Sequence, residues 1–284
     1  MSTAPGDVLV SIVTVCYNAA ELLPMTMESV LAQDYNNYEY IIKDGGSTDN
    51  TEEIVLKYAK RFKEKNICLN YISDEDTGIY DAMNIAVTSC SGKWINFMNA
   101  GDCFYNETVL SEIFKKTYPS SAILYGDCVE YEYGRFYLFP KDYDKILSAM
   151  PFSHQAVFAN RELLSRYPFK TRYHYSADYD FLLTAHDLEL HFTDVDCVVC
   201  ITNKDGVSSV NYHDMLDEGA LIRKVHNLPI PSAAEADRIE KSLTIKQYVL
   251  DHFPVFIKKF IRGIQIKYRG QSFNCIVPYW YNYK

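Results

Sequence analysis

The sequence lacks the glycine signatures of several common α/β enzymes. No Gly-x-Gly-x-x-Gly follows the first apolar run, no Gly-x-x-x-x-Gly-Lys-Ser/Thr is present, and no Gly-x-Ser-x-Gly occurs. Rossmann-type dinucleotide binding, P-loop chemistry and the nucleophile elbow of α/β-hydrolases are therefore excluded.

Long apolar runs are missing as well. No run reaches the ~18 residues that a membrane-spanning helix needs. Residues 1–7 show no basic segment followed by an apolar one, so we expect no secretory signal. The eight cysteines are irregularly spaced and most lie in apolar, strand-like runs, which favours reduced thiols in a cytoplasmic protein.

Acidic residues stop at Asp251. The segment after it carries a charge of +6, whereas the rest holds 22 basic and 37 acidic residues, a net of −15. An acidic body argues against nucleic-acid binding. Residues 253–284 also carry many aromatic side chains, among them Tyr279, Trp280 and Tyr281, and residues 255–266 fit a basic amphipathic helix. We expect this tail to lie on an anionic membrane; the alternatives are packing on the acidic body or a homodimer contact.

The first half alternates between apolar runs and helical patterns. Strands are predicted at 9–17, 38–43, 67–73 and 93–98, and helices after Asn18 as a cap, at 51–63 and at 79–87. This alternation predicts an α/β fold with a mostly parallel central sheet flanked by helices. Ligands of such sheets bind beyond the carboxyl ends of the strands, where the polar motifs of this chain lie.

The second half is less regular. It predicts strands at 122–131, 135–139, 153–159 and 190–202, and helices at 177–186, 214–225 and 235–251. We expect a domain over residues 1–212, divided into two halves at 1–105 and 106–212. A helical, basic and aromatic extension over 213–284 completes the chain.

Several polar motifs occur in a recognisable order. The strongest are Val10–Asn18 (VSIVTVCYN), Ile42–Asp49 (IKDGGSTD), Asp76–Asn84 (DTGIYDAMN) and Phe97–Asp102 (FMNAGD). Weaker ones follow at 151–155 (PFSHQ), 176–181 (SADYDF) and 206–209 (GVSS). In residues, order and spacing they resemble the inverting glycosyltransferases of family 2, and most closely the bacterial surface-polysaccharide branch of the colanic-acid and capsule type.

The resemblance implies the GT-A fold, a nucleotide diphosphate-sugar donor, most often a UDP-hexose, and Mn²⁺ or Mg²⁺. It implies an inverting hexosyltransferase acting on a growing, polyprenyl-linked glycan at the inner face of the cell membrane. A nucleotide-sugar pyrophosphorylase would need a phosphate loop where residues 17–20 read Tyr-Asn-Ala-Ala. A non-catalytic nucleotide-sugar-binding subunit is the alternative from another class.

Donor-binding positions follow from the matched motifs. The resemblance places in the donor site Thr14, Tyr17, Asp44, Asp76, Asp81, Asn84, Asn99 and Ala100. Family members often carry a second acid after Asp44, where this chain has Gly45. Simpler structural roles remain open for some of these residues: Tyr17 can cover a strand end, and Gly45–Gly46 can form a turn.

Catalytic and metal positions come from the later motifs. Asp102 matches the metal-binding acid, with Asn99 as a neutral oxygen donor. Asp178 matches the general base, with Asp180 the next candidate. His154 and Gln155 match a pair near the sugar or the acceptor, although a lone His in an apolar strand is often structural. His213 is a further candidate metal ligand.

Overall fold

The computed structural model describes residues 9–132, 135–203, 212–230 and 277–282, together with single residues and short runs between 232 and 252. Its first half follows the predicted alternation. The elements are β1 (Val10–Cys16), α1 (Leu23–Leu31), β2 (Tyr38–Asp44), α2 (Thr51–Glu64), β3 (Leu69–Ser73), α3 (Ile79–Thr88) and β4 (Trp94–Phe97). Asn18 does not cap α1: its φ is 49°, and its side chain accepts the N–H of Thr48.

The second half contains more elements than the sequence predicts. They are β5 (Cys103–Phe104), α4 (Val109–Phe114), β6 (Ile123–Glu132), β7 (Arg135–Phe139), β8 (Val157–Asn160), α5 (Arg161–Arg166), α6 (Ala177–Asp187), β9 (Phe192–Asn203) and α7 (Tyr212–Val225). Short 3₁₀ turns lie at Tyr143–Lys145, His154–Ala156 and Tyr279–Asn282.

The strands form one nine-stranded sheet in the order β3-β2-β1-β4-β8-β6-β9-β5, with β7 paired to β6. The strands β3, β2, β1 and β4 are parallel, as predicted. Beyond β4 the sheet is mixed, because β8 runs antiparallel to both β4 and β6. The carboxyl ends of β1, β2 and β4 therefore meet at one edge, where the loops that follow them carry the polar motifs.

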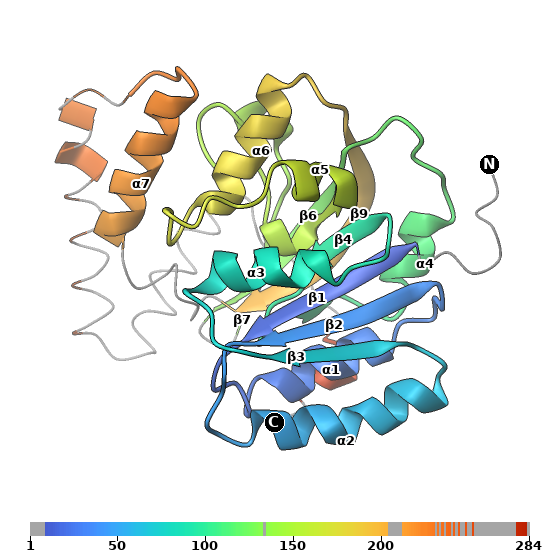
Figure 1. The fold of residues 1–284 in the computed structure, drawn as a ribbon. Coiled ribbons are helices and arrows are strands. Elements are labelled where there is room, and N and C mark those ends of the chain that lie inside the picture. Colours follow the sequence, from blue (N-terminus) through green and yellow to red (C-terminus); the bar gives the residue numbers. More distant parts are fainter. Residues whose placement is uncertain are drawn as a thin grey trace.

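Helices cover both faces of the sheet (Figure 1). One apolar core lies between the sheet and α1, α2 and α4, and a second lies between the sheet and α3, α5 and α6. The central strand β1 is buried from Val10 to Val15, so even its polar side chains lie inside the protein. This burial on both faces explains why the strand is a continuous apolar run.

Helix α7 packs against α6 and does not stand apart from the sheet and its helices. Ile222 is fully buried in the core that also holds α3, α5 and α6. His226, just after the helix, contacts Asp180 and Asp187 of α6. The first helix of the predicted extension is therefore part of the same packed unit.

The end of the chain also returns to the body. The Trp280 side chain is 1% exposed, and its indole N–H donates to the carbonyl of Phe104 at 3.1 Å. Tyr281 packs against Tyr131 and Phe136. The expectation that these aromatic residues lie on a membrane is wrong for Trp280, because its ring is enclosed by protein. The predicted helix at 255–266 lies outside the described residues.

No helix in the described parts of the chain is long and apolar enough to cross a bilayer.

Candidate functional site

Five of the predicted site residues form one connected group at the sheet edge. The His154 side chain contacts both Asp178 and Asn99. The Gln155 amide donates to the carboxylate of Asp102. Because His154 and Gln155 are neighbours in the chain, one short turn links the predicted base to the predicted metal-binding acid. This convergence of three separate segments could not be seen from spacing alone.

Asp178 lies in the first turn of α6, with its side chain 17% exposed. One carboxylate oxygen accepts the Tyr80 hydroxyl at 3.1 Å and the Tyr179 N–H at 2.8 Å. The other lies 3.1 Å from Nδ1 of His154. Burial and the charge of Asp178 raise the pKa of Tyr80 well above its ordinary value, so the phenol stays protonated and remains a donor. The carboxylate is therefore held in place and still reaches solvent.

His154 lies in the 3₁₀ turn His154–Ala156, not in the predicted strand, which begins only at Val157. Burial alone would lower its pKa, but the hydrogen bond and charge of Asp178, with the charge of Asp102, outweigh burial and raise the pKa above its ordinary value. With Nδ1 donating to Asp178, the neutral ring can accept the Asn99 amide at Nε2, a contact of 3.2 Å. The two carboxylates thus offset the effect of burial on the ring.

Asp102 follows the turn after β4 and is almost completely buried. One oxygen accepts the Gln155 amide at 2.7 Å and the other the backbone N–H of Asn203 at 3.2 Å. Burial raises its pKa to about 6, against the lowering effect of these two hydrogen bonds. A nearby cation would relieve the cost of the buried charge, so this acid suits metal binding.

Asn99 supplies a second oxygen in the same turn. Its Oδ1 is buried and has no hydrogen-bond partner in the described part of the protein. Such an orphan acceptor is unusual, because buried polar atoms are nearly always paired. No group of three or more His, Cys, Asp or Glu side chains among the described residues could hold a metal alone. A metal at Asp102 and Asn99 would therefore need ligands from a bound anion. Ala100, between them, is half-buried.

Asp44 ends β2 and is buried, with both oxygens engaged. Oδ2 accepts Tyr71 and Ser73, and Oδ1 accepts the backbone and hydroxyl of Ser47. The carboxylate therefore braces the turn after β2 against β3. A ligand would reach this acid only by displacing one of these partners.

Asp76 is the more accessible acid of the donor side. Its side chain is 13% exposed and pairs at 2.8 Å with Lys43, whose side chain is completely buried. A Cβ at Gly45 would meet the Asp76 carboxylate at 3.0 Å and the Tyr17 ring at 3.5 Å. Asp76 thus occupies the space that a second acid at position 45 would need. Tyr17, 63% exposed, leaves a ring face open beside it.

Three predicted donor residues are engaged within the protein. Thr14 is completely buried, and its hydroxyl contacts Tyr40 and the Met98 carbonyl. Asn84 uses both ends of its amide on the backbone of Phe169. Thr14 is enclosed by protein, so the expectation that it lines the donor site is wrong, whereas half-buried Asn84 is held by the Phe169 backbone and its donor role stays a prediction. Asp81 accepts the N–H and hydroxyl of Thr77 and is half-buried, so it shapes the loop before α3.

Sequence reasoning missed residues that act on the site through other side chains. Lys43 holds Asp76, Tyr80 holds Asp178, and Glu218 of α7 binds the segment before α6. Only Lys43 could have been noticed in the sequence, because it lies in a mostly apolar strand and a buried ammonium needs a charged or polar partner. Tyr80 and Glu218 lie in helical sequence patterns, and nothing in those patterns marks them as contacts of the site.

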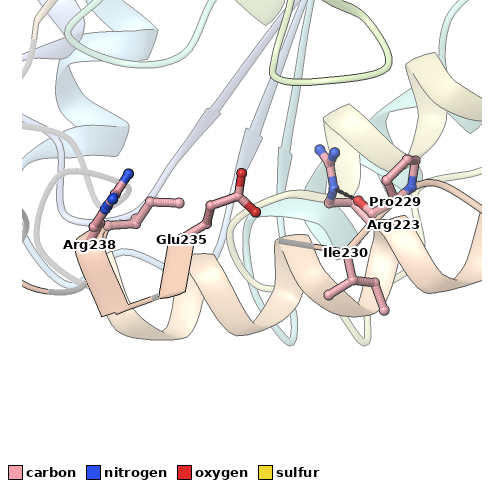
Figure 2. A pocket seen from close by; sticks show the side chains of 6 residues that line it. Arg223, Pro229, Ile230, Glu235 and Arg238 are labelled. Atoms are coloured by element: carbon pink, nitrogen blue, oxygen red, sulfur yellow. Dashed lines mark hydrogen bonds between the residues drawn. The ribbon is translucent and has the colours of Figure 1, made fainter. Parts of the chain in front are cut away.

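The described residues form a small cavity beside His154 and Asp178 and a shallow groove away from them. A small, mostly apolar cavity of about 20 Å³ is lined by His154 and Asp178 together with Met83, Phe97, Phe169 and other apolar side chains. A shallow groove of about 390 Å³ lies at the end of α7 (Figure 2), lined by Arg223, Pro229, Ile230, Glu235, Arg238 and Ile239. Arg223 there donates to the Pro229 carbonyl. None of the predicted site residues lines this groove.

The predicted motif at 206–209 and the side chain of His213 lie outside the described residues.

Comparison with known proteins supplies the family context. A family model described as Glycosyl transferase family 2 matches residues 11–179. A "PGL/p-HBAD biosynthesis glycosyltransferase" of Mycobacterium tuberculosis is 33% identical over 178 residues, which cover 60% of this chain and 67% of that protein. The family match over residues 11–179 includes most of the donor-side motifs and Asp178.

Solved structures share the fold at low sequence identity. S. aureus TarS 1–349 in complex with UDP-GlcNAc has a TM-score of 0.60 and 19% identity, covering 80% of this chain and 69% of that chain. The mannosyltransferase PcManGT from Pyrobaculum calidifontis, with GDP-Man and Mn²⁺, has a TM-score of 0.58 and 21% identity, covering 76% and 62%. The chain spans 41% of the longer TarS structure. The expected GT-A fold is confirmed.

Proposed function

Since the chain belongs to glycosyl transferase family 2, we propose that it transfers a hexose, with inversion, from a nucleotide diphosphate-sugar to a growing cell-surface glycan. A UDP-sugar is the proposed donor, in keeping with the UDP-GlcNAc named for TarS. The acceptor is proposed to be a polyprenyl-linked intermediate of the surface-polysaccharide type, reached at the cytoplasmic face of the membrane.

One observation carries the proposal: neighbouring residues of one turn contact both acids that the reaction requires. His154 contacts Asp178 at 3.1 Å, and Gln155 contacts Asp102 at 2.7 Å. An inverting transfer needs a base on one side of the sugar and stabilisation of the departing diphosphate on the other. The turn fixes the two groups relative to each other, which supports a catalytic role over a binding role alone.

Asp178 is the proposed base. Its carboxylate takes the proton from the acceptor hydroxyl as the hydroxyl oxygen attacks the anomeric carbon. The bond from that carbon to the diphosphate breaks in the same step, on the opposite face of the ring. Tyr80 and His154 donate hydrogen bonds to the carboxylate and orient it toward the acceptor hydroxyl.

Asp102 and Asn99 are proposed to hold the divalent cation. Burial of the Asp102 carboxylate raises its pKa, and Asn99 carries an unpaired oxygen, so a cation held by these residues would relieve both costs. When bound, Mn²⁺ or Mg²⁺ would neutralise charge on the leaving diphosphate. Mn²⁺ is named with GDP-Man in the PcManGT structure, which supports this part of the proposal.

The nucleoside is proposed to lie against Tyr17 and Asp76. The exposed Tyr17 ring offers an apolar face for a base, and the Asp76 carboxylate can accept from sugar hydroxyls. Gly45 leaves room between them, because a side chain there would meet both. Asp44 and Asp81 support these loops.

A donor assay with paired variants tests the proposal. The wild-type protein with Mn²⁺ should turn over at least one member of a nucleotide-sugar panel. Asp178→Asn should keep nucleotide affinity and lower kcat by ~10²–10⁴, the usual contribution of a positioned base. The control Asp217→Asn removes an exposed acid of α7 and should change neither. Near-normal kcat in Asp178→Asn would refute the assignment of the base.

A further inference from the structure

The carboxylate of Glu218 accepts hydrogen bonds from three consecutive backbone N–H groups in the segment that precedes α6. The donors are His174 at 2.5 Å, Tyr175 at 2.9 Å and Ser176 at 3.1 Å. Glu218 belongs to α7, and its side chain is only 13% exposed. Asp178 lies two residues beyond the last of these donors.

The Glu218 carboxylate binds the backbone at the N-terminus of α6, the place where a capping side chain usually binds. Ser176 is the N-cap residue of α6, yet its side chain makes no capping hydrogen bond. The amides just before a helix carry partial positive charge, and a carboxylate stabilises them more strongly than a neutral acceptor does. The first turn of α6, which carries Asp178, is therefore fixed from outside by α7.

Helix α7 is itself well anchored. Glu218, Ile222 and His226 follow one another at intervals of four residues and so share one side. Ile222 is completely buried, and His226 contacts Asp180 at 3.2 Å and Asp187 at 2.5 Å. Three contacts of different kinds thus hold α7 along the length of α6.

The far end of the same segment is held separately. Asn84 of α3 accepts the N–H of Phe169 and donates to its carbonyl, at 2.9 and 2.8 Å. Lys170 pairs with Asp180 at 2.9 Å. The segment from Phe169 to Ser176 is therefore fixed at both ends, and only the Glu218 end adjoins the proposed base.

We infer that Glu218 is a positioning residue for the transfer reaction: by binding the amides of residues 174–176 it holds Asp178 against His154 and toward the acceptor hydroxyl. This inference rests on the proposed function. Glu218 lies beyond the family match, which ends at residue 179. The catalytic centre thus includes a residue from the C-terminal part of the chain, and removal of α7 would disturb the base without removing any reacting group.

Steady-state kinetics of Glu218→Ala and Glu218→Gln test the inference, with Asp217→Ala as the matched control on the exposed side of α7. Displacing a reacting group by about 1 Å can cost ~100-fold in rate. Glu218→Ala should therefore lower kcat by roughly 10- to 100-fold, with the donor KM within twofold of wild type. Glu218→Gln keeps one acceptor oxygen but turns an NH2 group toward a backbone N–H, so it should lose kcat measurably, though less than Glu218→Ala. Asp217→Ala should match wild type.

Wild-type kcat in a folded Glu218→Ala protein would overturn the inference, and so would an equal loss in donor affinity. If Glu218→Ala does not fold, Glu218→Gln decides: a kcat indistinguishable from wild type overturns it. A crystal structure of either variant gives a readout without turnover. An unchanged contact between Asp178 and His154 in Glu218→Ala overturns the inference; a displaced Asp178 in an enzyme that transfers no sugar overturns only the proposed function.

Discussion

Replacing Asp76 by asparagine tests the buried ion pair on the donor side. The Lys43 side chain is completely buried, and its ammonium donates to the Asp44 carbonyl at 2.9 Å, the Asp74 carbonyl at 2.6 Å and the Asp76 carboxylate at 2.8 Å. All three N–H groups are used, but only one partner carries a negative charge. Asp76→Asn leaves a hydrogen-bond acceptor in place and removes that charge.

The size of the effect follows from burial. Leaving a buried charge without its partner costs about 3–5 kcal/mol. Asp76 is partly exposed, so water screens the pair and the asparagine oxygen recovers part of the loss; we expect about 2–3 kcal/mol. A chain of this size loses about 2 °C in Tm per kcal/mol, so Tm should fall by about 4–6 °C.

A double-mutant cycle measured by thermal denaturation checks the reasoning. Lys43→Met removes the ammonium, and the double variant Lys43→Met/Asp76→Asn should be more stable than Asp76→Asn alone, since no unpaired charge remains. Asp74→Asn, which neutralises a neighbouring exposed acid, is the control. An unchanged Tm in Asp76→Asn, or additive losses in the double variant, would refute the ion-pair account.

Two further predictions concern Asp102 and Trp280. Folding raises the pKa of Asp102 to about 6, so the metal-free folded state binds the proton more tightly than the unfolded one and loses stability as pH rises through about 4–6. Asp102→Asn should therefore be more stable than wild type above pH 6.5 in EDTA, by up to about 3 kcal/mol of unfolding free energy. At pH 4 the two proteins should have the same Tm. A Tm difference that does not vary with pH would contradict the burial effect. Trp280→Ala should lower stability by about 3–5 kcal/mol in thermal denaturation, whereas Tyr279→Ala, at an exposed neighbour, should cost under about 1 kcal/mol. Equal losses would show that the indole is not anchored.

The first half of the fold could be predicted because three of its strands, β1, β2 and β4, are buried on both faces. The predicted strand at 38–43 and helix at 51–63 match β2 and α2 to within one residue. The second half gave weaker signals: β5 has two residues and α4 and α5 have six each, too short for a periodic pattern.

The motifs named side chains that do lie together: Asp178 contacts His154, and Asp102 contacts Gln155, while their roles stay predictions. A motif gives the position of a residue and not the direction of its side chain, so the burial of Thr14 and the contact of Asn84 with the backbone could not be foreseen. The Thr14 hydroxyl on β1 contacts the Tyr40 hydroxyl on the neighbouring strand β2. The Asn84 amide donates to the carbonyl of Phe169, which lies 85 residues away in the chain.

Supporting residues were harder to predict because their partners are distant in sequence. Glu218 contacts backbone amides at positions 174–176, and a backbone amide leaves no trace in the residue type. Lys43 could be recognised as unusual, but its partner Asp76 is 33 residues away. Such contacts depend on how α7 and the loop after β3 are packed, which local patterns do not encode.

The turn containing His154 and Gln155 limits how this enzyme could change its donor sugar. Successive Cα atoms are about 3.8 Å apart across one peptide bond, and that bond cannot stretch. The two acids are therefore held through one pair of adjacent residues, and neither acid can move far without losing its contact with this turn. A lineage that adopts a bulkier sugar while keeping both contacts has to leave these acids in place. It would have to change the walls around them, and the open side next to Tyr17 and Leu22, both exposed, is where such substitutions could accumulate.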